Sequence, residues 1–281
     1  MFEGAIAIVT GGASGIGKAV VGALANAGAQ VTIADRQEEL GVSVAEELNG
    51  ASRTSNVRFV STDVSDYAQV AELIHHTHAA SNRLDFLFNN AGVSVGGYVS
   101  DYSHEDWDRV LSVNLDGVVN GIQTAYPIMR RQGSGHIVNT ASLAGLIPSP
   151  MNVAYTASKH AIIGLSRALR PEASTYGVRV SVICPGVVRT PMLEGGGKYG
   201  RLATAVPEDV IAAAWEAANP IGPEVCAEKI LEGVAANREI IFAPSRGRLL
   251  WWIERVVPSL LTSRGFEKLR KEFHQGHQDD A

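Results

Sequence analysis

Short apolar runs alternate along this chain with stretches of helical periodicity, and this alternation limits the fold more than any other feature. Strands that are apolar on both faces are typical of a parallel sheet covered by helices on both sides. The repeated strand–helix–strand order predicts an α/β fold with one doubly wound parallel sheet. The helical stretches include Gly15–Ala27, Tyr67–Ala80, Asp106–Arg131 and Tyr155–Ser174. The expected strands are Ala5–Val9, Gln30–Ala34, Val57–Ser61, Asp85–Phe88, His136–Thr140, Arg179–Ile183 and Glu239–Ala243.

The chain is long enough for one large α/β domain. Of its 281 residues, 46% are hydrophobic and 19% are charged, so it can bury a sizeable core. About seven strands fill residues 1–244, no linker divides them, and residues 245–281 follow as a C-terminal extension. The net charge of −5 argues against nucleic-acid binding over the whole surface.

Cysteine content and the absence of targeting signals favour a cytoplasmic location. The two cysteines, Cys184 and Cys226, cannot build a disulfide framework, which suggests a reducing compartment. No apolar run reaches the length of about 18 residues that a membrane span needs. The first residues lead directly into an apolar strand without a basic region, so we expect no signal peptide.

A glycine-rich turn follows the first strand and opens the first helix. In the segment Thr10–Gly17, glycines allow the backbone to approach a pyrophosphate, and the helix N-terminus offers free N–H groups. The second strand is followed by Asp35, whose carboxylate can bind both ribose hydroxyls of an adenosine and would repel a 2′-phosphate. NAD is therefore the expected cofactor, unless Asp35 is only a solvated loop residue. NADP stays open as an alternative because the neighbouring Arg36 could accept a phosphate.

Six short motifs in the expected order make the sequence resemble the short-chain dehydrogenase/reductase family, over residues 5–192. Each motif is weak alone, but their order on the expected elements makes chance agreement improbable. The resemblance implies a Rossmann-like fold and a nicotinamide cofactor. The motifs are TGxxxGxG at Thr10, Gly11, Gly15 and Gly17, NNAG at Asn89, Asn90, Ala91 and Gly92, the central asparagine Asn114, the serine Ser142, YxxxK at Tyr155 and Lys159, and Pro185, Gly186 and Thr190 after the sixth strand.

The resemblance also implies which residues contact the cofactor. Asp63 and Val64 would lie at the adenine, and Thr190 would reach the nicotinamide carboxamide. The NNAG segment would line the middle of the cofactor while also forming a structural turn at the strand end. The full implied set is Gly11, Ser14, Gly15, Ile16, Gly17, Asp35, Arg36, Asp63, Val64, Asn90, Ala91, Gly92, Tyr155, Lys159, Pro185, Gly186, Val188 and Thr190.

Tyr155 and Lys159 are four residues apart on a helical stretch and therefore share one face. A tyrosine with its ordinary pKa near 10 is a poor base at neutral pH, and a nearby ammonium or an oxidised nicotinamide would lower that pKa. Tyr155 would then exchange a proton with an alcohol or a ketone. Ser142 would hydrogen-bond the substrate oxygen, and the resemblance implies that Asn114 holds a water linking Lys159 to solvent. The alternatives are a surface Tyr–Lys pair and a helix cap at Ser142.

We therefore expect an oxidoreductase that transfers a hydride between a nicotinamide cofactor and a hydrophobic secondary alcohol or ketone. The alternative is a dinucleotide-binding regulatory protein, although such proteins typically lose the Tyr/Lys pair. The resemblance implies a homodimer or homotetramer.

Three segments, Val93–Tyr98, Leu143–Asn152 and Met192–Leu202, should border the substrate. They supply an apolar lining of Leu143, Leu146, Ile147, Pro148, Met151, Met192, Leu193 and Tyr199.

Several local features carry smaller expectations. The cluster His75, His76 and His78 is interpreted as a solvated helix surface, so no metal site is expected. Pro171 should bend its helix, more than two turns beyond Lys159. The segment Glu194–Asn219 is interpreted as a mobile loop that contains a small helix.

The extension carries an aromatic and basic segment over residues 246–271. Apolar residues, among them the tryptophans Trp251 and Trp252, alternate there with seven basic residues, and only Glu254 and Glu267 oppose the positive charge. Such a segment can lie on an anionic membrane surface. It can equally pack across a subunit interface or cover its own pocket, and the sequence leaves these three alternatives open.

Overall fold

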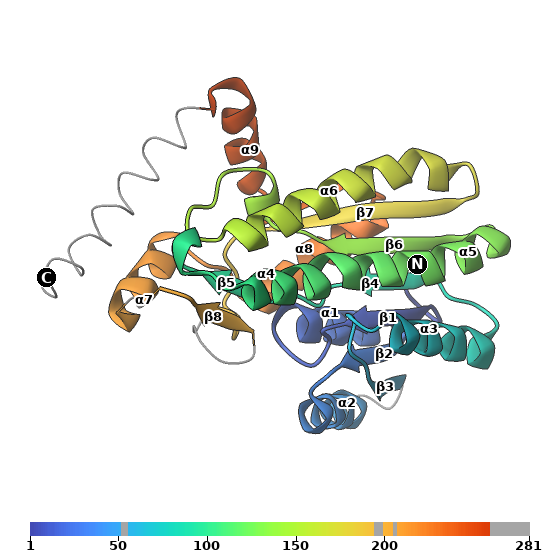
Figure 1. Cartoon of the computed structure of the whole chain (residues 1–281). Coiled ribbons are helices and arrows are strands. Elements are labelled where there is room, and N and C mark those ends of the chain that lie inside the picture. Colours follow the sequence, from blue (N-terminus) through green and yellow to red (C-terminus); the bar gives the residue numbers. More distant parts are fainter. Residues whose placement is uncertain (52–55, 194–198, 205–206, 259–281) are drawn as a thin grey trace, which may run out of the picture.

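The computed structural model describes residues 1–51, 56–193, 199–204 and 207–258. Its centre is a seven-stranded, fully parallel sheet with the strand order β3-β2-β1-β4-β6-β7-β9 (Figure 1). All seven predicted strands are confirmed, with boundaries shifted by at most a few residues. They are β1 Ile6–Thr10, β2 Gln30–Asp35, β3 Asn56–Ser61, β4 Phe86–Asn89, β6 Gly135–Thr140, β7 Val178–Pro185 and β9 Ile240–Ala243.

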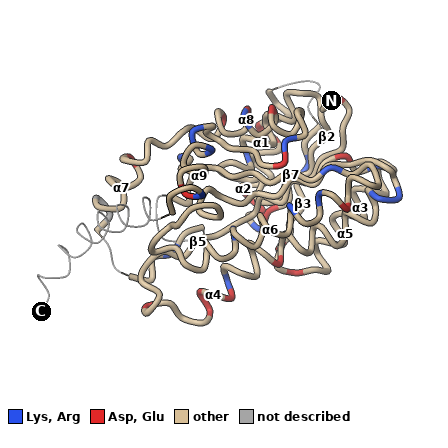
Figure 2. Tube along the Cα trace, turned by 90° about the horizontal axis from the view of Figure 1, so that it is seen from above, with Lys and Arg blue, Asp and Glu red and all other residues tan. Residues whose placement is uncertain are grey.

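Helices cover both faces of the sheet, as the apolar strands predict. Successive side chains of β1 point to opposite sides, so Ala7 and Val9 pack into one core and Ile6 and Ile8 into the other. Figure 2 separates the two helical layers, with α1 and α8 on one side of the sheet and α3, α5 and α6 on the other. The helices are α1 Gly15–Asn26, α2 Glu38–Ala51, α3 Tyr67–Ser81, α4 His104–Leu111, α5 Gly117–Gln132, α6 Val153–Ser174, α7 Glu208–Ala217, α8 Pro223–Ala235 and α9 Gly247–Val256.

The stretch Asp106–Arg131, predicted as one helix, is interrupted in the structure. A π-helical turn over Ser112–Asp116 separates α4 from α5, and the Gly117 N–H bonds to the carbonyl of Ser112, five residues earlier. Turns of this kind widen the helix by one residue and are frequent at functional sites. Here the widened turn contains Asn114, so the departure from the expected helix falls on a predicted site residue.

Pro171 lies in the last turn of α6. The helix runs through Pro171 and ends three residues later at Ser174. Because the missing N–H affects only the end of the helix, Tyr155 and Lys159 sit on an uninterrupted stretch near its beginning.

A small second sheet lies over the carboxyl end of the main one. Its strands, β5 Ser94–Gly96 and β8 Gly200–Leu202, pair in parallel. The Tyr98 N–H donates to the Thr204 hydroxyl at 2.8 Å, and Arg201 forms an ion pair with buried Asp106. The predicted loop Glu194–Asn219 thus contains β8 and the helix α7, while residues 194–198 and 205–206 lie outside the described part.

The first part of the C-terminal extension folds back on the sheet. The Trp251 ring of α9 packs against Phe242 of β9 at 5.9 Å between centroids. The guanidinium of Arg246 donates to the carbonyls of Ala218 and Asn219, which ties the start of α9 to the end of α7. Residues 259–281 of the extension lie outside the described part. Within the described residues, no helix combines the length and apolar character needed to cross a membrane.

Candidate active site

The glycine-rich turn between β1 and α1 leaves its helix N-terminus open. Ser14 occupies the N-cap position of α1, but its side chain makes no capping hydrogen bond, so the first N–H groups of the helix are available to a ligand. Gly17 allows the turn to close, since a Cβ there would lie 2.0 Å from the Gly11 carbonyl oxygen. The open helix end and the tight turn together form the shape that a pyrophosphate requires.

The NNAG segment packs directly against this turn. The Thr10 hydroxyl accepts the N–H groups of Asn90 and Ala91 at 2.9 and 3.0 Å. The neighbouring Asn89 faces the sheet interior instead and donates to Asn139 at 2.8 Å. Asn89 is therefore structural, whereas Asn90, Ala91 and Gly92 line the cavity in front of the turn.

Asp35 ends β2 with its carboxylate held in place by two backbone groups. The N–H groups of Ala13 and Gln37 each donate to it at 3.1 Å, one to each oxygen. Asp35 lines the same cavity as the glycine turn. The adjacent Arg36 turns away from it toward Asp63, with 3.4 Å between nitrogen and oxygen. Backbone N–H groups thus fix both oxygens of Asp35 at the cavity, while Arg36 pairs with Asp63 instead.

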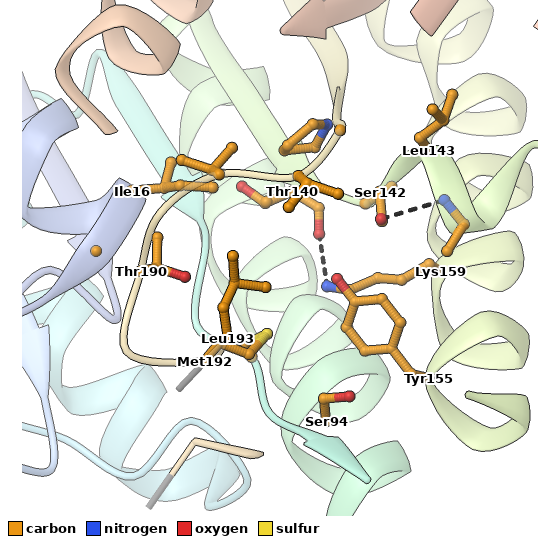
Figure 3. A pocket seen from close by; sticks show the side chains of 18 of the residues that line it. Ile16, Ser94, Thr140, Ser142, Leu143, Tyr155, Lys159, Thr190, Met192 and Leu193 are labelled. Carbon is orange, nitrogen blue, oxygen red and sulfur yellow. Dashed lines mark hydrogen bonds between the residues drawn. The ribbon is translucent and has the colours of Figure 1, made fainter. Parts of the chain in front are cut away.

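Lys159 is buried beneath the tyrosine of the same helix. Its exposed fraction is 3%, and its ammonium donates to the Thr140 carbonyl at 2.9 Å (Figure 3). The Lys159 nitrogen lies 5.4 Å from the centre of the Tyr155 ring. In Figure 3 the side chains of Tyr155 and Ser142 point into one space, opposite Ile16, Thr190 and Met192.

Burial shifts the pKa values of both Lys159 and Tyr155 in the free protein. Loss of hydration lowers the pKa of Lys159 to about 8. Desolvation raises the pKa of Tyr155, and its contact with the Ser142 hydroxyl lowers it by a smaller amount. Burial therefore sets the direction of the net shift of the Tyr155 pKa in the free protein. The lowering of this pKa by Lys159 and by an oxidised nicotinamide stays a prediction.

Asn114 is fully buried behind this pair and holds the segment after β4 in place. Its amide oxygen accepts the Val93 N–H at 2.8 Å, and its amide nitrogen donates to the Val93 carbonyl at 3.0 Å and to the Ser158 hydroxyl at 3.1 Å. A Cβ at Gly92 would lie 3.3 Å from the Asn114 oxygen and 3.5 Å from the Lys159 nitrogen. A side chain at position 92 would therefore crowd the Asn114 amide.

The predicted cofactor residues gather around connected hollows at the carboxyl end of the sheet. Arg36, Asp63 and Val64 line a groove that begins at Asp35. All the other predicted cofactor and catalytic residues except Asn114 line a cavity of about 460 Å³. They include the segment after β7, which supplies Pro185, Gly186, Val188 and Thr190.

The inner part of the cavity has the apolar lining that the sequence predicts, with additions. Leu146 and Met151 do not line it. Leu146 packs instead into the core beneath α6. The cavity also has a wall made by α7 and α9. The part from α9 agrees with one of the alternatives that the sequence left open, in which the extension covers its own pocket, whereas the part from α7 was not predicted. The predicted lining residues found in the cavity are Leu143, Ile147, Pro148, Met192, Leu193 and Tyr199, and the additional ones are Trp215, Ala218, Pro244, Arg246, Gly247 and Leu250.

This arrangement suits a dinucleotide whose reactive ring lies beside a buried phenol, and the family match agrees with it. A model of the short chain dehydrogenase family matches residues 5–198, more than half of the chain. The chain belongs to the short-chain dehydrogenase/reductase family. It is thus a member of an oxidoreductase family with a Rossmann-like fold.

Curated relatives match most of the length of this chain. Levodione reductase from Leifsonia aquatica is 38% identical over 199 residues, which are 70% of this chain and 74% of that protein. The 3-alpha-(or 20-beta)-hydroxysteroid dehydrogenase of Mycobacterium tuberculosis is 37% identical over 219 residues, 78% of each chain. Both relatives are named for reactions at a carbonyl or hydroxyl group.

Solved structures extend the similarity to nearly the whole chain. A short chain dehydrogenase/reductase from Burkholderia phymatum in complex with NAD has a TM-score of 0.80 and 31% identity, covering 92% of this chain and 95% of that one. The crystal structure of a levodione reductase has a TM-score of 0.76 and 28% identity, covering 86% and 96%.

Other side chains that could bind a metal or act as nucleophiles lie apart from this chemistry. His75 and His76 are exposed on α3, and no group of three metal-ligating side chains occurs among the described residues. Cys184 is buried near Lys159, and burial raises the pKa of its thiol to about 12. The thiol therefore stays protonated and packs as a small apolar group.

Proposed function

We propose that this protein is an NAD-dependent dehydrogenase that interconverts a hydrophobic secondary alcohol and its ketone. The proposal rests above all on Tyr155, whose hydroxyl shares one cavity with the glycine turn and lies next to the buried Lys159. A phenol at the wall of an apolar cavity can pass a proton to and from a substrate oxygen that water does not reach.

In the oxidation direction, the Tyr155 oxygen takes the proton of the substrate hydroxyl as the carbonyl forms. Bound NAD would supply the acceptor for the hydride of the carbinol carbon and a positive charge near the phenol. Ser142 hydrogen-bonds the substrate oxygen and orients it toward Tyr155. Lys159 stabilises the phenolate, and Asn114 positions the route by which the proton reaches solvent.

NAD is the proposed cofactor because Asp35 faces the ribose position with both oxygens fixed. A 2′-phosphate would meet this carboxylate at close range, and the Arg36 side chain that could neutralise it is paired with Asp63. NADP is the alternative, and a comparison of the two cofactors at equal concentration distinguishes them.

A hydrophobic alcohol or ketone is favoured by the side chains that face Tyr155. Leu143, Ile147 and Met192 surround the reacting position, and Trp215 and Leu250 extend the apolar wall. The relatives named for levodione and for hydroxysteroids support an alcohol or ketone without a phosphate group. We further propose a homodimer or homotetramer, following the family resemblance, and a cytoplasmic location, following the cysteine content of the sequence.

The direct test is turnover of a panel of cyclic and linear secondary alcohols and ketones, followed at the absorbance of the reduced nicotinamide. We expect activity with NAD, and we expect a higher kcat/KM for apolar substrates than for acidic substrates of similar size. A purified protein that binds NAD but turns over no member of the panel would instead favour a regulatory dinucleotide-binding protein.

A further inference from the structure

Helix α9 presents an apolar stripe to solvent on the side opposite the cavity. Leu249, Trp252, Ile253 and Val256 recur at spacings of three and four residues, so they lie on one face of the helix. The exposed fractions of Leu249, Trp252 and Val256 are 64%, 55% and 70%. Large apolar side chains this exposed and this close together mark a contact surface.

The opposite face of α9 is already used within the fold. Gly247 is buried, Leu250 lines the cavity and Trp251 packs on Phe242. Self-packing of the extension therefore accounts for one face only. Figure 1 shows α9 at the periphery of the described fold, so its outer face can meet a large flat partner.

Arginines border the stripe, and the nearby acid does not neutralise them. Arg248 and Arg255 are exposed and seven residues apart, so they lie along one edge of the stripe. The Arg255 guanidinium sits over the Trp251 ring at 5.4 Å. Glu254 points inward, since its Oε2 atom is buried without a hydrogen-bond partner among the described residues. The outer face is therefore apolar with a positive edge.

We propose that the outer face of α9 docks this protein on an anionic lipid bilayer. A helix with tryptophan and leucine on one face and arginine along its edge lies in the plane of the interface, with the apolar side chains below the headgroups and the guanidiniums among the phosphates. A second copy fits less well. In a two-fold contact with antiparallel helices the two arginine edges would lie side by side, and like charges would repel.

Docking through α9 also places the cavity beside the membrane. The outer side chains meet the bilayer while Gly247 and Leu250 of the same helix form part of the cavity wall. An apolar substrate dissolved in the bilayer would then reach the cavity along α9. This consequence rests on the proposed function, whereas the docking itself does not.

The test is co-sedimentation of the full-length protein with vesicles of phosphatidylcholine alone and of phosphatidylcholine mixed with phosphatidylglycerol. We expect binding to the mixed vesicles that weakens as salt is added. Leu249→Glu and Trp252→Glu should each weaken it by about tenfold or more. The matched control is Val225→Glu, because Val225 is 49% exposed on α8 and should leave binding unchanged. Arg248→Gln should weaken binding more than Arg131→Gln, an exposed position on α5.

Absence of binding to the mixed vesicles, or equal binding by the Leu249→Glu and Val225→Glu proteins, would overturn the proposal. Sedimentation velocity adds a second readout without lipid. If Leu249→Glu dissociates an oligomer while the unmodified protein ignores vesicles, the stripe is a subunit contact and the proposal is wrong. Vesicle binding by a protein without turnover would leave the docking intact and contradict only the proposed function.

Discussion

The Gln37 side chain donates a hydrogen bond to the Tyr199 hydroxyl, which joins the loop after β2 to the segment that enters β8. Tyr199 lines both the cavity at Tyr155 and the groove at Asp63. The contact thus connects the predicted adenosine and substrate sites across the position of the dinucleotide.

We expect Tyr199→Phe to accelerate release of reduced cofactor by about two- to tenfold, because one hydrogen bond across the bound dinucleotide is lost. Gln37→Ala should have a similar effect, and the double variant should be no worse than either single one. Stopped-flow fluorescence of NADH measures the release rate. The control is Tyr67→Phe, because the Tyr67 side chain is exposed on α3, and this substitution should leave the release rate unchanged. Additive effects of the two substitutions would show that the contact does not hold the cofactor.

Cofactor choice should depend on Asp35 and only weakly on Arg36. Asp35→Asn should lower the kcat/KM with NAD by about tenfold while raising the relative activity with NADP, because the fixed negative charge is removed. Arg36→Gln should change the kcat/KM with NAD by less than about twofold, since its guanidinium pairs with Asp63. Steady-state kinetics with both cofactors decide the point, and equal effects of the two substitutions would contradict this assignment.

Burial of Lys159 should make the free protein more stable as the pH rises from about 8 to about 10. The pKa of Lys159 is about 8 in the folded protein and 10.5 when unfolded, so the unfolded chain binds more protons in this interval. Above about 10 the raised pKa of Tyr155 acts in the opposite direction. In Lys159→Met the rise, on the order of 3 kcal/mol for the full shift, should disappear. Urea unfolding of both proteins across this pH range measures the free energy of unfolding. Identical pH profiles of the two proteins would contradict the lowered pKa of Lys159.

Helix α9 should limit the size of the substrates that the cavity accepts. Leu250→Trp would fill part of the cavity, so the KM for bulky substrates should rise while that for small alcohols stays nearly constant. Leu249→Trp, one residue earlier on the exposed face, is the matched control and should change neither value. Equal KM values for all three proteins would mean that α9 does not contact substrate.

The sheet and most of the site could be predicted from local sequence because their causes are local. Val, Ile and Phe runs define the strands, and the motifs at Gly11, Asn90 and Tyr155 fall at strand ends or helix starts. Parallel strands bring these positions to one edge, which is why the structure gathers them in one place.

The parts that could not be predicted depend on packing between distant segments. The wall formed by Trp215 and Leu250 depends on how α9 folds back through the Trp251–Phe242 contact. The π-helical turn contains Asn114, which bonds to the distant Val93, and no periodicity in the sequence indicates this turn. The pKa of Tyr155 rises for the same reason, because spacing reveals the nearby lysine but not the depth of burial.

Replacement of Tyr155 by phenylalanine tests the central claim most directly. The measurement pairs the turnover rate with an accepted alcohol and the affinity for NAD from titration calorimetry. The account predicts a loss of turnover of about a hundred- to ten-thousand-fold, with NAD affinity nearly unchanged. A Tyr155→Phe protein with the full rate of the unmodified protein would contradict it.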